Sequence, residues 1–378
     1  MDFNLSEEQL MLADTVQRFV EQEYEFEERK KLARTDRGYS ELHWQTLSDI
    51  GLTGLLVPES FGGMGAGPQE ALIVMEALGR GLVLEPLLST AFVAVPLIAR
   101  HGNKAQQQLL LPDIAQGRLR LAIASLEPEA RFDLWQVATE ARPQEGGRYL
   151  LQGRKTVVIQ GDSAQQLIVS ARTSGNSSDK DGITLFLVDA KAMGVTVKGF
   201  PNIDGHHSAE IFLNNVAVDG SAVLGEVGRG YEPLEWATDR GIAALCAEAV
   251  GTMAKLFDLT VEYLRTRKQF GQPIGRFQVL QHRATDMLVA VEQARSIALL
   301  AAARVDNPDP GSRRKAVSAA KSVVGRNGRF IGEQSIQLHG GMGMTDELAA
   351  GHYFKRLNCI DMTWGDSSHH QELYGDVM

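Results

Sequence analysis

The sequence predicts an α+β protein with helices at both ends and an antiparallel β-barrel or sandwich between them. Apolar residues recur at helical spacing over residues 1–120 and again after 228, whereas 121–228 holds short β-like runs separated by Gly, Asn and Asp. These runs follow one another without helical crossovers, which favours antiparallel over parallel pairing. We therefore expect an N-terminal helical domain (1–120), a middle β-domain (121–228) and a C-terminal helical bundle domain (229–378).

The N-terminal domain opens with a helix-start signal, because Ser6 followed by Gln9 is typical of a capping box. Further helices are predicted over 40–50 and 68–79, on either side of a glycine-rich loop at 55–67.

The β-like runs of the middle domain include LAIASL, KTVVIQG, QLIVSAR, GITLFLVD and AEIFLNNVAV. Beyond them, long helices are predicted over 232–265, 277–305, 310–339 and 346–362. Residues 240–255 and 284–304 are Ala-rich and apolar on much of their surface, which suits the core of a bundle or a subunit interface.

Composition and charge are those of an ordinary globular protein. The 378 residues include 38 Lys and Arg against 47 Asp and Glu, a formal charge of −9, with 44% hydrophobic and 22% charged residues. These values exclude long disorder. An acidic balance without a Lys/Arg run argues against nucleic-acid and anionic-membrane partners, although local arginines can still hold a small anionic ligand.

Cysteine use and the first residues predict a soluble, cytoplasmic protein. Cys246 and Cys359 form no CxxC pair, so neither a disulfide framework nor a thiolate metal site is expected. The N-terminus carries acids early and lacks the apolar core of a signal peptide. The longest apolar stretch, 84–99, includes an acid and two prolines, which argues against a membrane span. The histidine pairs at 206–207 and 369–370 lack an HExxH pattern and predict hydrogen-bonding groups, with no metal site.

The segment from Arg265 to Gln278 reads RTRKQFGQPIGRFQ and joins two predicted helices. Guanidinium groups bind phosphate through paired hydrogen bonds, and glycines let the backbone approach a ligand closely. A phosphate-bearing ligand is one interpretation of this segment, and a solvated basic connection is the other.

A second glycine cluster, QLHGGMGMT at 337–345, closes a predicted helix at Gly340. A helix C-cap explains one glycine, whereas the additional Gly341 and Gly343 favour backbone contact with a ligand. The spacing is not GxGxxG after a strand, so a Rossmann fold is not supported.

Asp239 and Arg240 begin an apolar helical run. An acid in the first turn of a helix usually stabilises the helix dipole, and a catalytic carboxylate is the alternative.

Together, these motifs resemble those of the acyl-CoA dehydrogenases. RxxFGxxI with FQ, followed further along by QxxGGxG, is specific in combination, and LSEEQ, VPESFGGMG, FLNNVAV and LGEVGRG occur in the order that family shows. The likeness covers almost the whole chain. It is closest to the branch of smaller subunits, the pimeloyl-CoA and steroid side-chain acyl-CoA dehydrogenase type.

The resemblance implies the acyl-CoA dehydrogenase fold, with FAD between the β-domain and the C-terminal helices. The residues that match the family's FAD contacts are Arg267, Gln269, Phe270, Gln278, Gln337, Gly340 and Gly341. It also implies an acyl-CoA substrate, an electron-transferring flavoprotein as electron acceptor, and a tetramer that is homomeric or includes a sister acyl-CoA dehydrogenase chain.

Two flavin-contacting segments depart from the family pattern. The family's TEPxxGSD reads SLEPEARFD at 125–133, so Leu126 replaces the threonine, and the family's WITN reads VVIQ at 157–160. Ser125 and the backbone are the contacts that the resemblance leaves beside the flavin ring.

The base that removes the α-proton is also displaced. Most members carry a Glu after an aromatic residue in YEGT, where this chain has Trp364, Gly365 and Asp366. Other members carry the base in an acid–Arg pair at the start of a C-terminal helix, which matches Asp239–Arg240. The resemblance therefore implies Asp239 as the base, Arg240 as a residue that positions the thioester, and Asp366 as the reserve candidate.

The expected function is flavin-dependent α,β-dehydrogenation of an acyl-CoA to the trans-2-enoyl-CoA, in fatty acid or steroid side-chain β-oxidation. A non-catalytic subunit that completes the FAD site of a sister chain is the alternative, and a flavin oxidase on the same fold is a third. Small residues near the proposed base suggest room for a branched or ring-bearing acyl group: Gly365, Gly241, Ala243 and Ala244.

Overall fold

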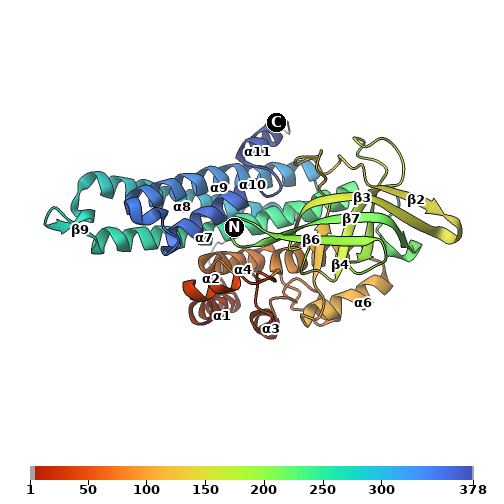
Figure 1. Cartoon of the computed structure of the whole chain (residues 1–378), viewed down its shortest axis with the longest axis horizontal. Helices are drawn as coiled ribbons and strands as arrows, with labels where there is room; N and C mark the ends of the chain where they lie inside the picture. The colour runs from red at the N-terminus through yellow and green to blue at the C-terminus, as the bar shows by residue number, and fades with distance from the viewer. Residues whose placement is uncertain (1–4, 377–378) are drawn as a thin grey trace. The chain divides into compact units, whose positions relative to one another are not determined.

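The computed structural model describes residues 5–376, and Figure 1 shows its helices and strands. They form two compact units, and neither unit is continuous in sequence. The helical unit comprises the chain up to Lys31, Pro68–Val83 and the chain from Ile242 onward. The sheet unit comprises Leu32–Gly67 and Leu84–Gly241.

The helical unit is built from long helices: α1 (Glu7–Glu23), α2 (Phe26–Leu32), α4 (Pro68–Gly81), most of α7 (Tyr231–Thr266), α8 (Gln278–Arg304), α9 (Pro310–His339), α10 (Ala349–Met362) and α11 (Ser367–Asp376). The helices predicted over 232–265, 277–305 and 310–339 are present, each within one residue at either end. The sequence did not predict α11. In Figure 1, α8 and α9 run side by side, and the short strand β9 lies at one end of the unit.

The capping box predicted at Ser6 is confirmed. The Ser6 hydroxyl accepts a hydrogen bond from the Gln9 backbone N–H at 3.2 Å, and the Gln9 side chain accepts one from the Ser6 N–H at 3.0 Å. Two of the N–H groups that every helix start leaves unpaired are thereby satisfied.

Helices α4 and α7 cross at two glycines. A Cβ atom on Gly79 would lie 2.1 Å from the Glu248 carbonyl oxygen, and one on Gly251 would lie 1.8 Å from the Glu76 carbonyl oxygen. Because both obstacles are backbone atoms, only glycine allows this close approach. The Thr252 hydroxyl also lies 3.2 Å from the Gly79 carbonyl oxygen.

The sheet unit combines a few helices with one large sheet. Its helices are α3 (Glu41–Asp49), η2 (Leu88–Ala94), α5 (Val95–His101) and α6 (Lys104–Ala115). Its strands are β1 (Leu121–Ala124), β2 (Glu140–Gln144), β3 (Arg148–Ile159), β4 (Gln166–Arg172), β5 (Ile183–Asp189), β6 (Val195–Pro201), β7 (His207–Val218) and β8 (Val223–Leu224).

The strands are ordered β6-β7-β3-β2-β4-β5-β8, and β1 pairs with β4 outside this path. Most neighbours are antiparallel, as predicted, but β1 runs parallel to β4 and a single bridge joins β2 to β4 in the same sense. The fold is therefore the predicted one, a helical N-terminal region, a middle sheet and a helical C-terminal region, with a mixed sheet. Strands β4 and β5 are buried along almost their whole length, whereas the edge strand β6 is largely exposed.

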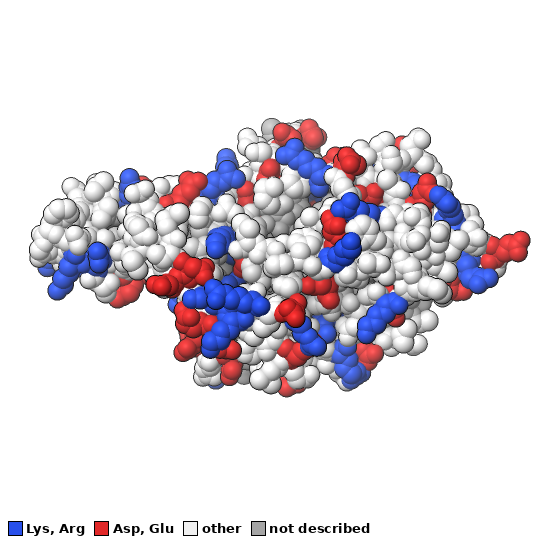
Figure 2. Space-filling model, viewed as in Figure 1, with Lys and Arg blue, Asp and Glu red and all other residues white. Residues whose placement is uncertain are grey.

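The apolar stretch at 84–99 is buried in the sheet unit, where it forms η2 and the start of α5. In the part of the chain that the structure describes, no helix has both the length and the apolar character needed to cross a membrane. Figure 2 shows acidic and basic side chains interspersed over the visible face.

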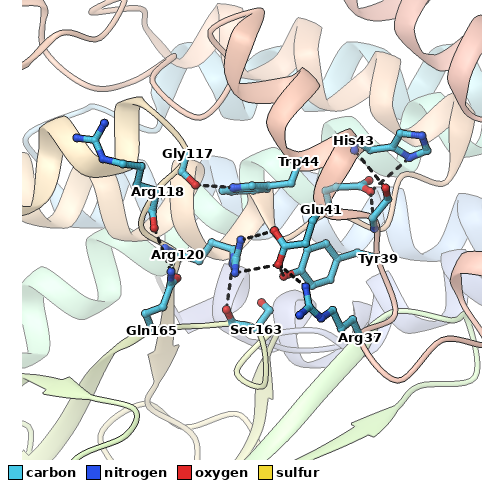
Figure 3. A network of polar contacts seen from close by, with 12 residues as sticks. Arg37, Tyr39, Glu41, His43, Trp44, Gly117, Arg118, Arg120, Ser163 and Gln165 are labelled. Atoms are coloured by element: carbon cyan, nitrogen blue, oxygen red, sulfur yellow. Dashed lines mark hydrogen bonds and ion pairs between the residues drawn. The ribbon is translucent and has the colours of Figure 1, made fainter.

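A polar network fixes the segment that leads into β1 (Figure 3). The Arg120 guanidinium forms two hydrogen bonds to the Glu41 carboxylate, at 3.0 and 3.2 Å, and a third to the Ser163 carbonyl oxygen at 3.1 Å. Beside it, the Trp44 indole N–H donates to the Gly117 carbonyl oxygen at 2.7 Å. These bonds hold Arg120, the residue directly before β1, against α3 and the segment that leads into β4.

Candidate functional site

A small hairpin after α7 presents an aromatic side chain to solvent. Strand β9 (Lys268–Gln269) pairs with β10 (Gln272–Pro273), and Phe270 and Gly271 form the turn with φ of 54° and 78°. Positive φ is unfavourable for a bulky residue, and such strain is typical of functional segments. The Phe270 side chain is 89% exposed.

Three polar residues predicted to contact FAD belong to this segment, and all three are exposed: Arg267, Gln269 and Gln278. Within residues 5–376, the Arg267 guanidinium makes no hydrogen bond or ion pair. Gln278 is the first residue of α8, and Phe277 before it offers no side-chain acceptor to the helix. A helix N-terminus without a side-chain cap and an exposed guanidinium are both suited to bind a phosphate group.

The second predicted segment lies where α9 ends. Gly340 has φ 61° and ψ −140°, a conformation that only glycine adopts readily, and a Cβ on Gly340 or Gly341 would meet nothing within 4 Å. The Gln337 side chain is exposed on the last turn of α9. The backbone at this point is therefore open to close approach by a ligand.

The structure brings these two segments together within the helical unit. The rings of Tyr263, one turn before Arg267 on α7, and His339, next to Gly340, lie 4.5 Å apart between centroids. Burial lowers the pKa of His339, and its Nδ1 donates to the Ser335 carbonyl oxygen at 2.8 Å. The neutral ring thus joins the end of α7 to the end of α9.

These observations fit a dinucleotide cofactor such as FAD. An exposed aromatic ring can stack on an aromatic ring system, the guanidinium and the α8 N-terminus suit a pyrophosphate, and the glycines leave space for a ligand against the backbone. The helical unit alone supplies all seven residues that the resemblance assigned to FAD in this region: Arg267, Gln269, Phe270, Gln278, Gln337, Gly340 and Gly341.

The sheet unit holds the remaining predicted FAD contact. Ser125 directly follows β1 and is 2% exposed. The next residue, Leu126, accepts a hydrogen bond from the Thr156 N–H at 2.9 Å. Val157 has φ 45° and is 49% exposed. The two segments that depart from the family pattern are therefore neighbours, with an exposed, strained valine in one of them.

Asp239 and Arg240 lie in the part of α7 that belongs to the sheet unit. Asp239 is fully buried, and the Arg240 guanidinium lies 5.1 Å from the centre of the Trp236 ring. Helix α7 begins at Tyr231, more than two turns earlier, so the interpretation of Asp239 as a first-turn, dipole-stabilising acid is wrong.

The turn that carries Asp366 is held by buried cationic and ring nitrogens. Lys321 Nζ on α9 donates to the carbonyl oxygens of Asp361 at 2.7 Å and Gly365 at 2.5 Å. The His370 Nε2 donates to the Trp364 carbonyl oxygen at 3.0 Å. Asp366 itself accepts from the His369 N–H at 2.8 Å and so caps α11.

Gly365 offers no room for a side chain of its own. Its φ is 111°, and a Cβ would lie 2.5 Å from the His369 ring and 2.9 Å from the His370 ring. Burial, with Lys321 nearby, lowers the pKa of His370 to about 2, so its ring stays neutral. The position where most family members carry their base is closed in this chain.

The other histidine pair also forms hydrogen bonds. His207 Nδ1 lies 2.7 Å from the Asp162 carboxylate. Among the described residues, no group of three or more His, Cys, Asp or Glu side chains is arranged to hold a metal ion.

Sequence reasoning missed the two buried lysines, Lys155 on β3 and Lys321 on α9. Neither side chain is exposed at all. The signal was a single lysine inside an otherwise apolar run, in KTVVIQ and in SAAKSVVG, which also occurs at exposed positions and therefore does not distinguish the two cases.

Comparison with protein-family models matches almost the whole chain. Residues 6–118 match the acyl-CoA dehydrogenase N-terminal domain, 122–216 the middle domain and 228–377 the C-terminal domain.

Individual proteins agree with the family models. A mitochondrial 2-methylacyl-CoA dehydrogenase from Solanum tuberosum is 30% identical over 372 residues, which covers 95% of this chain and 89% of that protein. A chain in the structure of the ChsE4–ChsE5 complex from Mycobacterium tuberculosis has a TM-score of 0.90 and 26% identity, covering 100% of this chain and 98% of that chain. A chain in the structure of the electron-transferring flavoprotein of Acidaminococcus fermentans has a TM-score of 0.91 and 26% identity, covering 99% and 98%.

Proposed function

Because the chain belongs to the acyl-CoA dehydrogenase family, which comprises FAD-dependent oxidoreductases acting on CH–CH bonds, we propose that Asp239 is the base of its reaction. The reaction is the flavin-dependent dehydrogenation of an acyl-CoA. The family comparisons favour this enzyme over a purely structural subunit.

The observation that carries the proposal is the closed position at Gly365. A carboxylate cannot project from residue 365, because its φ is 111° and two histidine rings fill the space. Asp366 is committed to capping α11. Asp239 is buried in α7 next to Arg240, where no structural role in helix capping accounts for it.

The chain's residues then have distinct tasks. The Asp239 carboxylate removes the α-proton of the acyl thioester, and the proton is held on that carboxylate. Arg240, adjacent in sequence, positions the thioester. Bound FAD would supply the acceptor for the hydride of the β-carbon, and loss of the proton and the hydride gives the trans-2-enoyl-CoA. An aspartate is one methylene shorter than a glutamate, so the acyl group must sit correspondingly closer to α7.

Ser125 and the segments at 267–278 and 337–341 bind FAD in this proposal. Ser125 contacts the flavin ring, Arg267 and the α8 N-terminus the pyrophosphate, and Gly340 the adenosine side. The exposure of the Arg267–Gln278 hairpin and the open backbone at Gly340 support this assignment.

Electrons leave to an electron-transferring flavoprotein, which the likeness to a chain in the Acidaminococcus fermentans structure supports. The protein is cytoplasmic in this proposal, in keeping with its free thiols Cys246 and Cys359. The substrate is a fatty acyl-CoA or a steroid side-chain acyl-CoA.

The working assembly is a tetramer, with a second copy or a sister chain as the partner. An apolar groove between α8 and α9, with Leu288, Val289 and Leu300 on its α8 side, supports an interface there, because each of these side chains is at least 40% exposed. The likeness to the ChsE4–ChsE5 complex supports a partner that is a different chain.

Asp239→Asn tests the proposed base. We expect the rate of enoyl-CoA formation to fall by about 10²–10⁴-fold, because the amide cannot accept the α-proton, with the flavin content unchanged. Rates are measured with an artificial electron acceptor across a panel of acyl-CoAs.

Asp366→Asn is the matched control, an identical change at the reserve candidate, and should leave most of the activity. Full activity in Asp239→Asn rules out the assignment. If Asp366→Asn alone inactivates the enzyme, the base is Asp366, and if neither change matters in the assembled tetramer, the partner chain holds it.

A further inference from the structure

A fully buried lysine contacts the segment after β1 that is proposed to lie beside the flavin ring. Lys155 on β3 has no exposed surface, and its Nζ lies 2.6 Å from Glu127 Oε1, 3.0 Å from the Ser170 hydroxyl and 3.4 Å from the Ser125 carbonyl oxygen. The three donors of the ammonium group thus have three oxygen partners, two from residues 125–127 after β1 and one from β4.

Glu127 completes the cluster from the other side. Its carboxylate also accepts the backbone N–H groups of Ala138 at 2.7 Å and Thr139 at 3.0 Å. Burial lowers the pKa of Lys155 to about 8, and Glu127 counteracts that effect. Burial by itself raises the pKa of Glu127, but the Lys155 ammonium and the N–H donors hold it below its usual value. Both groups are therefore charged at neutral pH.

The ion pair lies where β3 departs from regular pairing. The register between β3 and β7 shifts between Lys155 and Val158, so that Thr156 and Val157 form a bulge. The Thr156 N–H bonds to Leu126 in place of β7. Residues 125–127 and the bulge are thereby linked twice, once through the backbone and once through the ion pair.

We propose that the Lys155–Glu127 pair positions Ser125, Leu126 and the bulge at Thr156–Val157 for contact with the flavin ring. This inference rests on the proposed placement of Ser125 beside the flavin. Lys155 has no exposed surface and Glu127 is only 6% exposed, so both act through the segments they hold and are positioning residues.

Energetic considerations favour a positioning role for this ion pair over a role in stability alone. A buried ion pair gains little net stability over apolar side chains of similar volume, because its desolvation cost is close to its Coulombic gain. Its hydrogen bonds, in contrast, fix direction and distance at each oxygen. A role confined to stability and a positioning role therefore predict different outcomes when the whole pair is replaced.

The experiment compares Lys155→Met with the double variant Lys155→Met/Glu127→Gln, in the assembled flavoprotein. The measurements are the melting temperature, the FAD dissociation constant by fluorescence titration and the visible absorption band of the bound flavin. The single variant leaves a buried charge without its partner and should melt far below the wild type. The double variant should recover most of that loss and yet bind FAD about tenfold more weakly, with an altered flavin band.

Arg154→Met is the matched control. Arg154 is the adjacent residue on β3, points to the opposite face of the sheet and pairs with Glu210 at 2.6 Å, with 46% of its own side chain exposed. It should change neither the FAD dissociation constant nor the flavin band. An equal effect in Arg154→Met overturns the proposal, as does a double variant with wild-type melting, affinity and spectrum.

If both Lys155 variants fail to fold, Ser170→Ala tests the proposal in their place, because it removes only the hydroxyl beside the Lys155 Nζ. A shifted flavin band in Ser170→Ala supports the proposal and an unchanged band contradicts it. The Asp239 proposal is tested by enzyme activity, whereas this proposal is tested by FAD binding and by the flavin absorption band. Either proposal can therefore be rejected without rejecting the other.

Discussion

Gly365 lies in a turn whose neighbouring backbone oxygens are already bonded. His370 donates to the Trp364 carbonyl oxygen, and Lys321 donates to that of Gly365. Both donors are buried, so the turn cannot shift without leaving a buried polar group unpaired. At the scale of a residue, this is why a base at position 365 is incompatible with the chain and why the proposed base lies on α7.

Gly365→Ala measures how firmly that position is closed. The added Cβ meets the His369 and His370 rings and places a non-glycine residue at φ 111°. We expect the free energy of unfolding to fall by about 1–3 kcal/mol, measured by chemical denaturation.

Gly375→Ala on α11 is the control, because its Cβ would meet nothing within 4 Å. It should leave stability unchanged or slightly raised. A Gly365→Ala protein as stable as this control would show that the turn can adapt, and a base at 365 would again be possible.

Local sequence patterns singled out exposed residues of the candidate site and did not single out its buried lysine. Arg267, Gln269 and Gly340 belong to short motifs whose chemistry can be read without the fold. The partners of Lys155 are Ser125, Glu127 and Ser170, which lie 15 to 30 residues away from it in the sequence, so no local signal distinguishes this lysine from an exposed one.

At the scale of elements, the crossing of α4 and α7 depends on backbone contact. Gly79 and Gly251 each face a carbonyl oxygen of the other helix. Beyond the crossing, the Arg356 guanidinium on α10 forms a buried pair with Glu248 on α7, at 2.6 and 2.8 Å. Helix α7, which also carries Asp239, is thereby fixed from two sides.

Gly251→Ala should force α4 and α7 apart, because its Cβ would lie 1.8 Å from the Glu76 carbonyl oxygen. We expect a loss of roughly 1–3 kcal/mol in the free energy of unfolding, the usual cost of overpacking. The measurement is a denaturant titration followed by circular dichroism.

Gly351→Ala on α10 serves as the reference, since the nearest atom to its Cβ is 3.6 Å away. Alanine there should stabilise the helix by its higher propensity. A Gly251→Ala protein that behaves like Gly351→Ala would mean that the two helices do not touch as described.

Long helices were predictable because their apolar spacing repeats over many turns, as for α9, predicted over 310–339 and found at Pro310–His339. The parallel pairing of β1 with β4 could not be predicted, because the four residues of β1 do not indicate the direction of the strand. Helix α11 was missed since most of its residues are polar and only His370 is buried.

At the scale of the whole molecule, the proposed flavin residues belong to both compact units. The residues proposed to contact the phosphates and the adenosine belong to the helical unit, and Ser125 belongs to the sheet unit. The sheet-unit segment has lost the polar side chains of the family pattern, with Leu126 and Val157 in their place. A FAD site completed by a partner chain agrees with this distribution.

The flavin-to-chain ratio of the protein purified alone tests that expectation. We expect a ratio well below one from folded protein, rising on co-expression with a sister acyl-CoA dehydrogenase chain. The ratio follows from the visible spectrum and the protein concentration. A ratio near one for the chain alone would establish that it builds complete sites as a homomer.

The division of the chain also has a consequence for its synthesis. Helices α1 and α4 are synthesised before the part of their unit that begins at Ile242. Until then, the apolar side of α4, with Leu72, Ile73 and Met75, has no native cover from that later part of the chain. The sheet unit, complete at Gly241, can form first. Contacts across such sequence separations form slowly, so we expect the apolar side of α4 to stay without this cover until the later helices have been made.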